Sequence, residues 1–205
     1  MTEEKYPVDS MNFKELAGLN PEDVCKQALC RYDEIKKSYT ISVWGDRYEI
    51  FLDELKIESL SSSSSKKQHD YFYVFLVNYL IQAKDANLCN EWISEKDIAG
   101  GSTFFRGPHE IPTRFIASSY SQNIEKFKIV CEELGGTPIN MADAAYSFAI
   151  TPRILIAVLF WDKDDDFPAD AKILFDRSIS QQLALDTIFA LAVAICSRLG
   201  KKGQK

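Results

Sequence analysis

The sequence concentrates its reactive side chains in one ten-residue stretch, 100–109, which combines three glycines, two phenylalanines, an arginine and one of the two histidines of the chain. Glycines let the backbone turn sharply or approach a ligand closely. An arginine and an imidazole beside them would hold two polar groups over an apolar floor. The stretch therefore predicts a ligand-binding loop, whose candidate residues are Gly100, Gly101, Phe104, Phe105, Arg106 and His109.

His109 offers the most varied chemistry of these residues. Imidazole changes its charge near neutral pH and has two nitrogens, so it suits a general base, a proton donor, or an axial ligand to a metal or tetrapyrrole. In the enzyme hypothesis His109 is the acid or base, and Glu110, Asp165 or Asp166 orients it. The alternative is a histidine that only hydrogen-bonds the backbone or caps the next helix.

The known motifs near this stretch are incomplete. His109 and Glu110 begin the zinc-protease pattern H-E-x-x-H, but Thr113 replaces the second histidine and Pro112 would break the helix. The glycines match neither a P-loop nor the dinucleotide fingerprint G-x-G-x-x-G. Two interpretations stay open: a shallow anion-binding loop with nearby arginines as counter-charges, or a glycine-rich turn whose phenylalanines belong to the core.

No metal site is predicted elsewhere in the chain. The acidic stretch 162–166 resembles the start of a calcium loop, but Phe167 stands where the loop needs glycine and Ile173 where it needs a bidentate glutamate. Cys25 and Cys30 are five residues apart on an expected helix, so they would diverge by about 140° and could not readily chelate one ion.

Composition narrows the class of protein. The chain has 205 residues, is 46% apolar, and has a formal net charge of −6, which argues against non-specific binding to nucleic acid or to anionic membranes. Its five cysteines are odd in number and irregularly spaced, and the N-terminus lacks a signal-peptide pattern, so we expect free thiols in the cytoplasm. The two most apolar segments, 71–81 and 183–196, are too short to span a membrane and predict core helices.

The elements that must position the loop can be read from periodicity. A helix is expected to begin at Asn20 and to carry an apolar face as far as Ile35, and a hairpin is expected over 39–52. Further helices are expected near 70–83, 111–120, 122–134 and 186–196. Strands are expected near 55–57, 92–98, 146–150 and 154–161, and a short strand or extended piece near 173–175. We expect the hairpin and the later strands to share one mostly antiparallel sheet packed by several helices, which is an α+β fold.

The same patterns predict the domain organisation. Residues 1–19 are expected to be a mobile N-terminal segment, 20–200 a single α+β domain, and 201–205 a basic tail. Within the domain, the serine and lysine run of 61–68 is expected to be a flexible loop, because it cannot bury apolar surface.

Three segments in order carry a family resemblance: the stretch 100–109, Trp161 with the sequence Asp-Asp-Phe-Pro-Ala at 165–169, and Ile-Leu-Phe-Asp at 173–176. Together they resemble the prokaryotic family labelled domain of unknown function 3786, over about residues 20–200. The resemblance implies an occurrence in anaerobes. Some members carry a cysteine-rich iron–sulfur segment, which this chain lacks, so no cluster is implied.

These observations lead to three functional hypotheses. The first is a ligand-binding accessory protein of anaerobic metabolism, which accepts an anionic, partly aromatic small molecule or a tetrapyrrole at the loop and at Asp165 and Asp166. The second is the enzyme in which His109 acts as acid or base. The third is a structural protein or homodimer, whose final helix packs its small residues Ala190, Ala194 and Ser197 against a partner.

Overall fold

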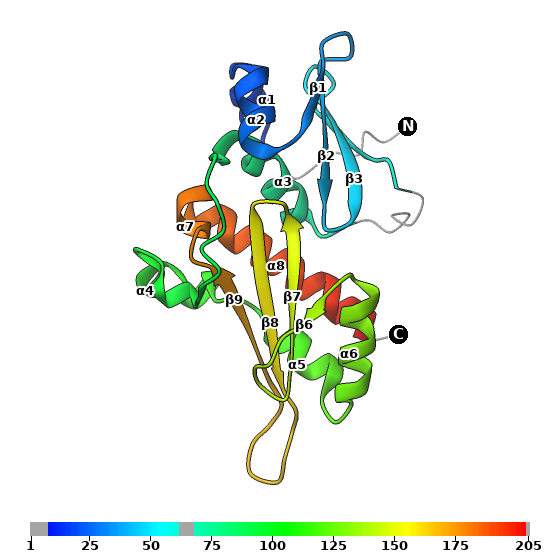
Figure 1. Cartoon of the computed structure of the whole chain (residues 1–205), viewed down its shortest axis with the longest axis vertical. Coiled ribbons are helices and arrows are strands. Elements are labelled where there is room, and N and C mark those ends of the chain that lie inside the picture. Colours follow the sequence, from blue (N-terminus) through cyan, green and yellow to red (C-terminus); the bar gives the residue numbers. More distant parts are fainter. Residues whose placement is uncertain (1–7, 62–67, 204–205) are drawn as a thin grey trace.

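A computed structural model describes residues 8–61 and 68–203 of the chain. The N-terminal third begins with two short helices, which are followed by a four-stranded sheet. The helices are α1 (Ser10–Ala17) and α2 (Pro21–Ala28), and the strands are β1 (Arg31–Asp33), β2 (Ser38–Val43), β3 (Asp46–Phe51) and β4 (Lys56–Ser59). Each strand pairs antiparallel with the next, so this sheet is a simple meander (Figure 1).

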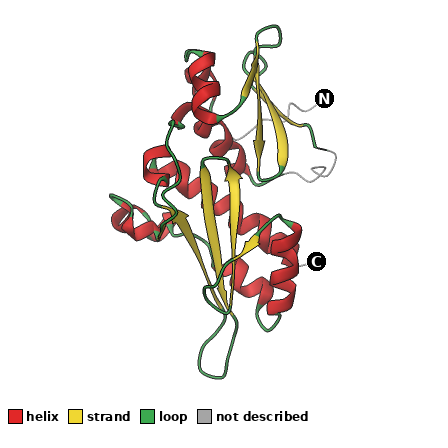
Figure 2. Ribbon diagram, in the orientation of Figure 1, coloured by secondary structure: helices red, strands yellow, loops and turns green. Residues whose placement is uncertain are grey.

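The remaining elements build a second sheet and the helices that cover it (Figure 2). The long helix α3 (Asp70–Gln82) leads into short elements around the glycine-rich stretch: β5 (Trp92–Ile93), the 3-10 helix η2 (Glu95–Asp97), α4 (Gly101–Phe104) and the 3-10 helix η3 (Gly107–His109). The chain then forms α5 (Arg114–Tyr120), α6 (Ile124–Glu133), β6 (Thr137–Pro138), β7 (Ala144–Thr151), β8 (Ile154–Trp161), β9 (Asp170–Asp176), α7 (Ile179–Gln182) and α8 (Leu185–Gly203).

The second sheet has the order β5-β9-β8-β7-β6, with all its pairs antiparallel. β8 is central, as its unbroken apolar run predicts, and six of its eight residues are buried. Figure 1 shows α8 passing behind this sheet, and α8 also packs against α3, α5 and α6. The helix is buried on most of its circumference because other elements surround it.

The hairpin between β2 and β3 connects the two sheets. Its turn residues Trp44 and Gly45 have φ of 49° and 80°, the left-handed values of a two-residue type I′ turn. The Trp44 backbone N–H donates to Ile150 O in β7 at 2.7 Å, and its indole N–H donates to Leu134 O at 3.0 Å. The Arg198 guanidinium of α8 lies 4.6 Å from the Trp44 ring centroid and pairs with Asp46 at 3.1 Å.

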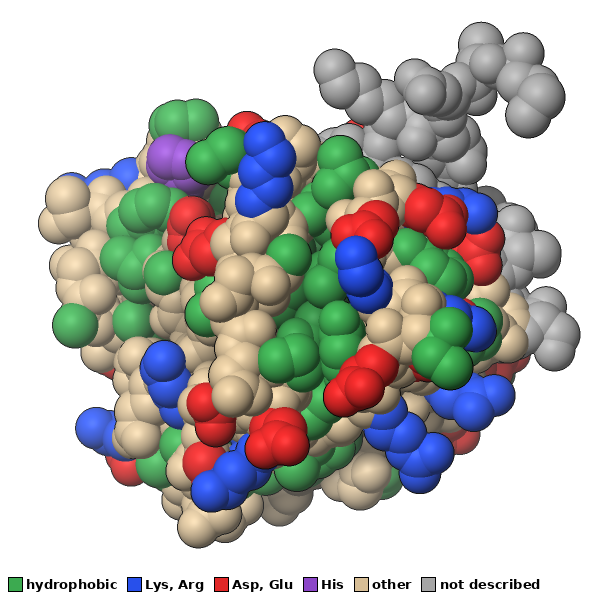
Figure 3. All heavy atoms as spheres, turned by 90° about the horizontal axis from the view of Figure 1, so that it is seen from above, with side chains coloured by type: hydrophobic (Ala, Val, Ile, Leu, Met, Phe, Trp, Pro, Cys, Tyr) green, Lys and Arg blue, Asp and Glu red, His purple; other side chains and the backbone are tan. Residues whose placement is uncertain are grey.

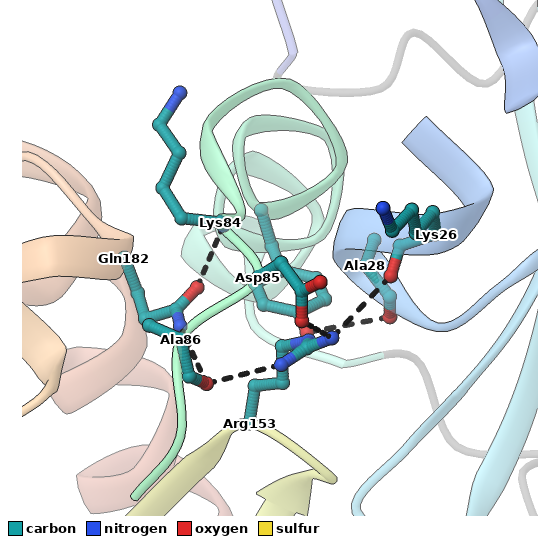
Figure 4. Close-up of polar contacts among 8 residues, drawn as sticks. Lys26, Ala28, Lys84, Asp85, Ala86, Arg153 and Gln182 are labelled. Carbon is teal, nitrogen blue, oxygen red and sulfur yellow. Dashed lines mark hydrogen bonds and ion pairs between the residues drawn. The ribbon is translucent and has the colours of Figure 1, made fainter. Parts of the chain in front are cut away.

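A second polar cluster ties the end of α2 to the turn between β7 and β8 (Figure 4). Arg153 in that turn donates to Ala86 O at 3.0 Å and to Lys26 O at 3.4 Å, and it pairs with Asp85 at 2.6 Å. Gln182 of α7 reaches the same Ala86 carbonyl at 3.5 Å. The larger cluster of buried apolar side chains spans both sheets, and a smaller one lies on the second sheet around Ala157, Leu159 and Leu174.

The α+β class and the antiparallel pairing are confirmed, whereas four sequence predictions about the elements are wrong. The strands form two sheets and not one, because β1 to β4 pair only with one another and β5 to β9 form a separate ladder. Residues 10–17, within the segment predicted to be mobile, form α1, whose Phe13 and Leu16 are buried. The predicted strand 92–98 is limited to β5, because a capping box between Ser94 and Asp97 starts η2.

The fourth wrong prediction concerns α2, which ends at Ala28 and does not continue to Ile35. Leu29 adopts the left-handed conformation with φ 55° and ψ 50°, and Ile35 is 96% exposed in a turn.

The predicted tail also starts later than expected, since Lys201–Gly203 complete α8. Most of the predicted loop 61–68 lies outside the described residues, and so do residues 1–7 and 204–205.

Candidate functional site

The glycines of the 100–109 stretch serve close packing. Gly100 has φ +78°, a left-handed value that favours glycine, and it lies against the Leu185 side chain at the start of α8. Gly101 is buried, and a Cβ on it would lie 1.9 Å from the Glu95 carbonyl oxygen. The sharp turn between η2 and α4 is therefore possible only with glycine at position 101.

The two phenylalanines of the stretch have different surroundings. Phe105 is 6% exposed and belongs to the core, whereas Phe104 is half-buried and stacks on the His109 imidazole with ring centroids 4.6 Å apart. The His109 imidazole also contacts Phe189 of α8, with the two rings edge to face and their centroids 5.4 Å apart. Phe189 in turn meets Tyr71 of α3 edge-on at 5.7 Å. The loop therefore joins a row of aromatic rings that includes residues from α3 and α8.

A hollow of about 220 Å³ opens beside these rings, between α3, α8 and the loop. Its wall consists of Tyr71, Val74, Asn78, Phe104, His109, Asp186, Thr187, Phe189 and Ala190. Two of the residues predicted from sequence, Phe104 and His109, thus line one concave surface together. The three residues from α3 are spaced by three and four positions, which places them on one side of that helix.

The polar groups of the hollow come mainly from the first turn of α8. The Thr187 backbone N–H donates to Asp186 Oδ1 at 2.7 Å, and the Thr187 hydroxyl lies 3.4 Å from the same oxygen. Both of these contacts use Oδ1, and the Asp186 side chain is exposed, so Oδ2 can accept from a ligand. The Asn78 amide is already used, because it donates to Val74 O at 2.9 Å and accepts from Asn12 at 3.1 Å.

The other predicted site residues lie elsewhere. Arg106 and Glu110 are exposed and are not in the wall of the hollow, and Arg114 lies over its own neighbour Phe115 at 5.5 Å. Asp165 and Asp166 belong to the loop between β8 and β9, which projects at the lower end of the molecule in Figure 1, away from α4. The loop of 162–169 is organised internally, with Asp164 Oδ1 accepting the backbone N–H groups of Asp166 and Phe167.

Sequence reasoning missed Asp186 and Tyr71 as site residues. Asp186 reads as an ordinary first-turn acid of a helix, and Tyr71 as part of an apolar run. No local signal joins them, since α3 and α8 meet only through tertiary packing.

A second hollow, of about 200 Å³, lies further along α8. It is lined by His69, Phe115, Val193, Cys196, Ser197, Gly200 and Lys201. The His69 Nδ1 accepts the Tyr71 backbone N–H at 3.2 Å and so caps α3. Burial and the nearby Lys201 charge lower the pKa of the His69 imidazole, which keeps that acceptor nitrogen unprotonated.

Three other kinds of functional region would require a metal site, a continuous basic surface or a membrane-spanning helix in the described residues. Within residues 8–61 and 68–203, no group of three or more His, Cys, Asp and Glu side chains is arranged to hold a metal ion. The face drawn in Figure 3 mixes acidic and basic side chains without a continuous basic surface. No helix in the described ranges has both the length and the apolar character needed to cross a bilayer.

Comparison with known proteins gives one match. No curated protein and no solved structure matches the chain. The model of the family described as a domain of unknown function (DUF3786) matches residues 20–198, which include α2, both sheets and the whole wall of the hollow. Because that match covers most of the chain, the protein belongs to this family.

Proposed function

We propose that the protein binds a small organic cation with a flat apolar group, such as an arylalkylammonium ion, in the hollow between α3, α8 and the 100–109 loop. The observation that carries the proposal is the combination of aromatic rings and one carboxylate on a single concave wall. Rings of Tyr71, Phe104 and Phe189 attract a cation through their π-faces, and Asp186 supplies the counter-charge.

The charges around the hollow support a cation over the anion expected from the sequence. That expectation depended on Arg106, which is not part of the wall, whereas Asp186 is. The net charge of −6 also favours the approach of a cation over that of an anion.

The volume restricts the size of the ligand. At about 220 Å³ the hollow lies below the range of roughly 300–1,000 Å³ that is typical for drug-sized molecules. A single-ring amine suits this volume, and an entire tetrapyrrole does not. We therefore choose benzylammonium as the probe, with benzyl alcohol and benzoate as neutral and anionic analogues of similar shape.

Isothermal titration calorimetry with these three probes tests the proposal. We expect benzylammonium to bind with a Kd of about 1 mM, and benzoate to bind at least about tenfold more weakly. Asp186→Asn keeps the Oδ1 acceptor for Thr187 but removes the charge, so it should lower the benzylammonium affinity by about tenfold and leave benzyl alcohol unchanged.

A matched pair of variants distinguishes binding in the hollow from binding elsewhere on the surface. Phe104→Ala should weaken benzylammonium binding by about threefold or more, because it removes one ring of the wall. Phe167→Ala is the control, since Phe167 is 70% exposed in the loop between β8 and β9. Equal affinity for all three probes, or equal loss in both variants, would refute a cation site at this hollow.

The finer parts of the sequence hypotheses remain proposals. An accessory role in anaerobic metabolism and a cytoplasmic location are in keeping with five cysteines that are all free thiols. In the acid–base hypothesis for His109, Asp186 becomes the relevant carboxylate, because it shares the hollow and Glu110 does not. For a homodimer, the final helix offers little free surface, since Ala190 and Ala194 are buried within the chain itself.

A further inference from the structure

Two of the five cysteines lie side by side at the end of α2. The sulfur atoms of Cys25 and Cys30 are 3.8 Å apart. This is the reverse of the sequence prediction, in which the two side chains diverge on a continuous helix.

The proximity has a backbone cause. The left-handed Leu29 reverses the chain after Ala28, and the Cys30 N–H then donates to the Cys25 carbonyl at 3.2 Å. This is the six-to-one hydrogen bond of a Schellman motif, which brings the fourth residue from the end of the helix into side-chain contact with the second residue beyond it. In this chain both positions are cysteines.

The surroundings hold the motif in place. The Lys26 carbonyl accepts from Arg153 at 3.4 Å and the Ala28 carbonyl accepts from the Tyr79 hydroxyl at 3.3 Å, so the end of α2 is fixed to α3 and to the turn before β8. Both cysteines are partly accessible, in contrast to the buried Cys131 and Cys196. A small reagent can therefore reach the pair without unfolding the core.

We propose that Cys25 and Cys30 form a dithiol that closes to an intrachain disulfide when it meets a small-molecule disulfide. A sulfur–sulfur bond requires about 2.0 Å between the atoms. From 3.8 Å the two sulfurs need to approach by less than about 2 Å. Side-chain rotation can supply this movement, because the hydrogen bond from the Cys30 N–H to the Cys25 carbonyl already holds the two backbones together.

The reaction balances with a disulfide such as oxidised glutathione as the oxidant. One cysteine thiolate attacks a glutathione sulfur, which forms a mixed disulfide and releases one glutathione thiolate. The second cysteine thiolate attacks the protein sulfur of that mixed disulfide, which forms the Cys25–Cys30 bond and releases the second glutathione thiolate. The two protons from the cysteines end on the two glutathione molecules, which are reduced by the two electrons that the cysteines lose.

Cys25 is the better first nucleophile. Burial raises the pKa of both thiols, and it raises that of Cys30 further because Cys30 is more enclosed. Since the thiolate is the reacting form, closure should become faster as the pH rises from 7 to 9.

The experiment treats the folded full-length chain with oxidised glutathione, blocks the remaining thiols with iodoacetamide, and analyses the intact protein and its tryptic peptides by mass spectrometry. We expect a product that has lost two hydrogen atoms and carries no glutathione at this pair, with the peptides of Cys25 and Cys30 linked. Cys30→Ser should instead stop at a mixed disulfide on Cys25, accumulating it at least about tenfold above the level in the unmodified sequence.

Two controls keep the result interpretable. Cys89→Ser removes the exposed cysteine and should leave closure unchanged, and circular dichroism of each variant verifies folding. Accumulation of the same glutathione adduct with and without Cys30, or linkage of Cys25 to Cys89 in place of Cys30, would overturn the proposal.

Discussion

Substitution of Gly101 by alanine tests whether the 100–109 stretch is shaped by packing. The new Cβ would lie 1.9 Å from the Glu95 carbonyl oxygen, so the two atoms must separate by about 1 Å or more to reach a normal contact. Neither atom can move by side-chain rotation, because both are held by the backbone of the turn between η2 and α4.

The expected cost follows from that geometry. Overpacking costs about 1–3 kcal/mol where side chains can adjust, so we expect about 3 kcal/mol for Gly101→Ala, where they cannot. Gly100→Ala should cost about 1–2 kcal/mol, because alanine at φ +78° is strained but sterically accommodated beside Leu185. Ser102→Ala, at an exposed position on the same short helix, should change stability by less than about 0.5 kcal/mol.

Urea unfolding followed by circular dichroism measures these differences, and thermal unfolding should show a fall in Tm of about 6–12 °C for Gly101→Ala. The displaced loop should also weaken benzylammonium binding, because Phe104 and His109 follow the turn directly. Equal stability of Gly101→Ala and Ser102→Ala would refute the packing explanation of this glycine.

Three further predictions concern the helix-capping His69, the contact of Arg198 with Trp44 and Asp46, and the pair of Cys25 and Cys30. Folding lowers the pKa of His69 below its ordinary value of about 6.5, so the stability that this cap contributes is fully present above pH 6.5 and is lost as the pH falls below it. His69→Ala should therefore cost about 1 kcal/mol at pH 8 and less at pH 5 in urea unfolding. Arg198→Leu should cost about 2–3 kcal/mol, because it removes the contact over Trp44 and leaves Asp46 without its guanidinium partner. Closure of the Cys25–Cys30 disulfide should raise the unfolding free energy by about 2 kcal/mol, as expected for a short loop, relative to the reduced protein.

Each of these predictions has a matched control. His69→Asn keeps an acceptor that does not titrate, so a pH slope equal to that of the unmodified protein would contradict the capping account. Arg177→Leu removes only an exposed ion pair with Glu91. An equal loss of unfolding free energy in Arg177→Leu and Arg198→Leu would contradict the stabilising role of the Arg198 contacts. Identical unfolding midpoints for the oxidised and reduced forms would contradict the stabilising disulfide.

Elements with strong local signals could be predicted from the sequence. The Trp44-Gly45 turn between alternating segments specifies the hairpin, the apolar run of 154–161 specifies a central strand, and the apolar stretch after Asp70 specifies a core helix. In each case a short, continuous stretch of sequence carries enough local preference to decide the structure.

The end of α2 could not be predicted in the same way. A helix stop is normally recognised by glycine at the left-handed position, but here Leu29 takes that conformation. Val24, Ala28, Leu29, Tyr32 and Ile35 therefore appeared to continue one helical face. The same error placed the thiols of Cys25 and Cys30 on different sides of a helix, whereas they are neighbours.

The candidate site was only partly accessible to sequence reasoning. Phe104 and His109 were found because they share a short stretch with unusual composition. Asp186 and Tyr71 lie more than 100 residues apart, and only the packing of α3 against α8 brings them to one hollow. Arg106 is exposed and lies outside the wall of the hollow. A charged residue beside an aromatic pair fits an exposed turn as well as a site.

The most direct test of the cation site is a titration of isotope-labelled protein with benzylammonium, followed by nuclear magnetic resonance. The central claim predicts that the largest shift changes occur at the Thr187 amide and the Phe104 ring, and that Asp186→Asn makes them much smaller at the same probe concentration. Changes confined to the hollow beside His69 and Lys201, or no saturable change at Thr187, would contradict it.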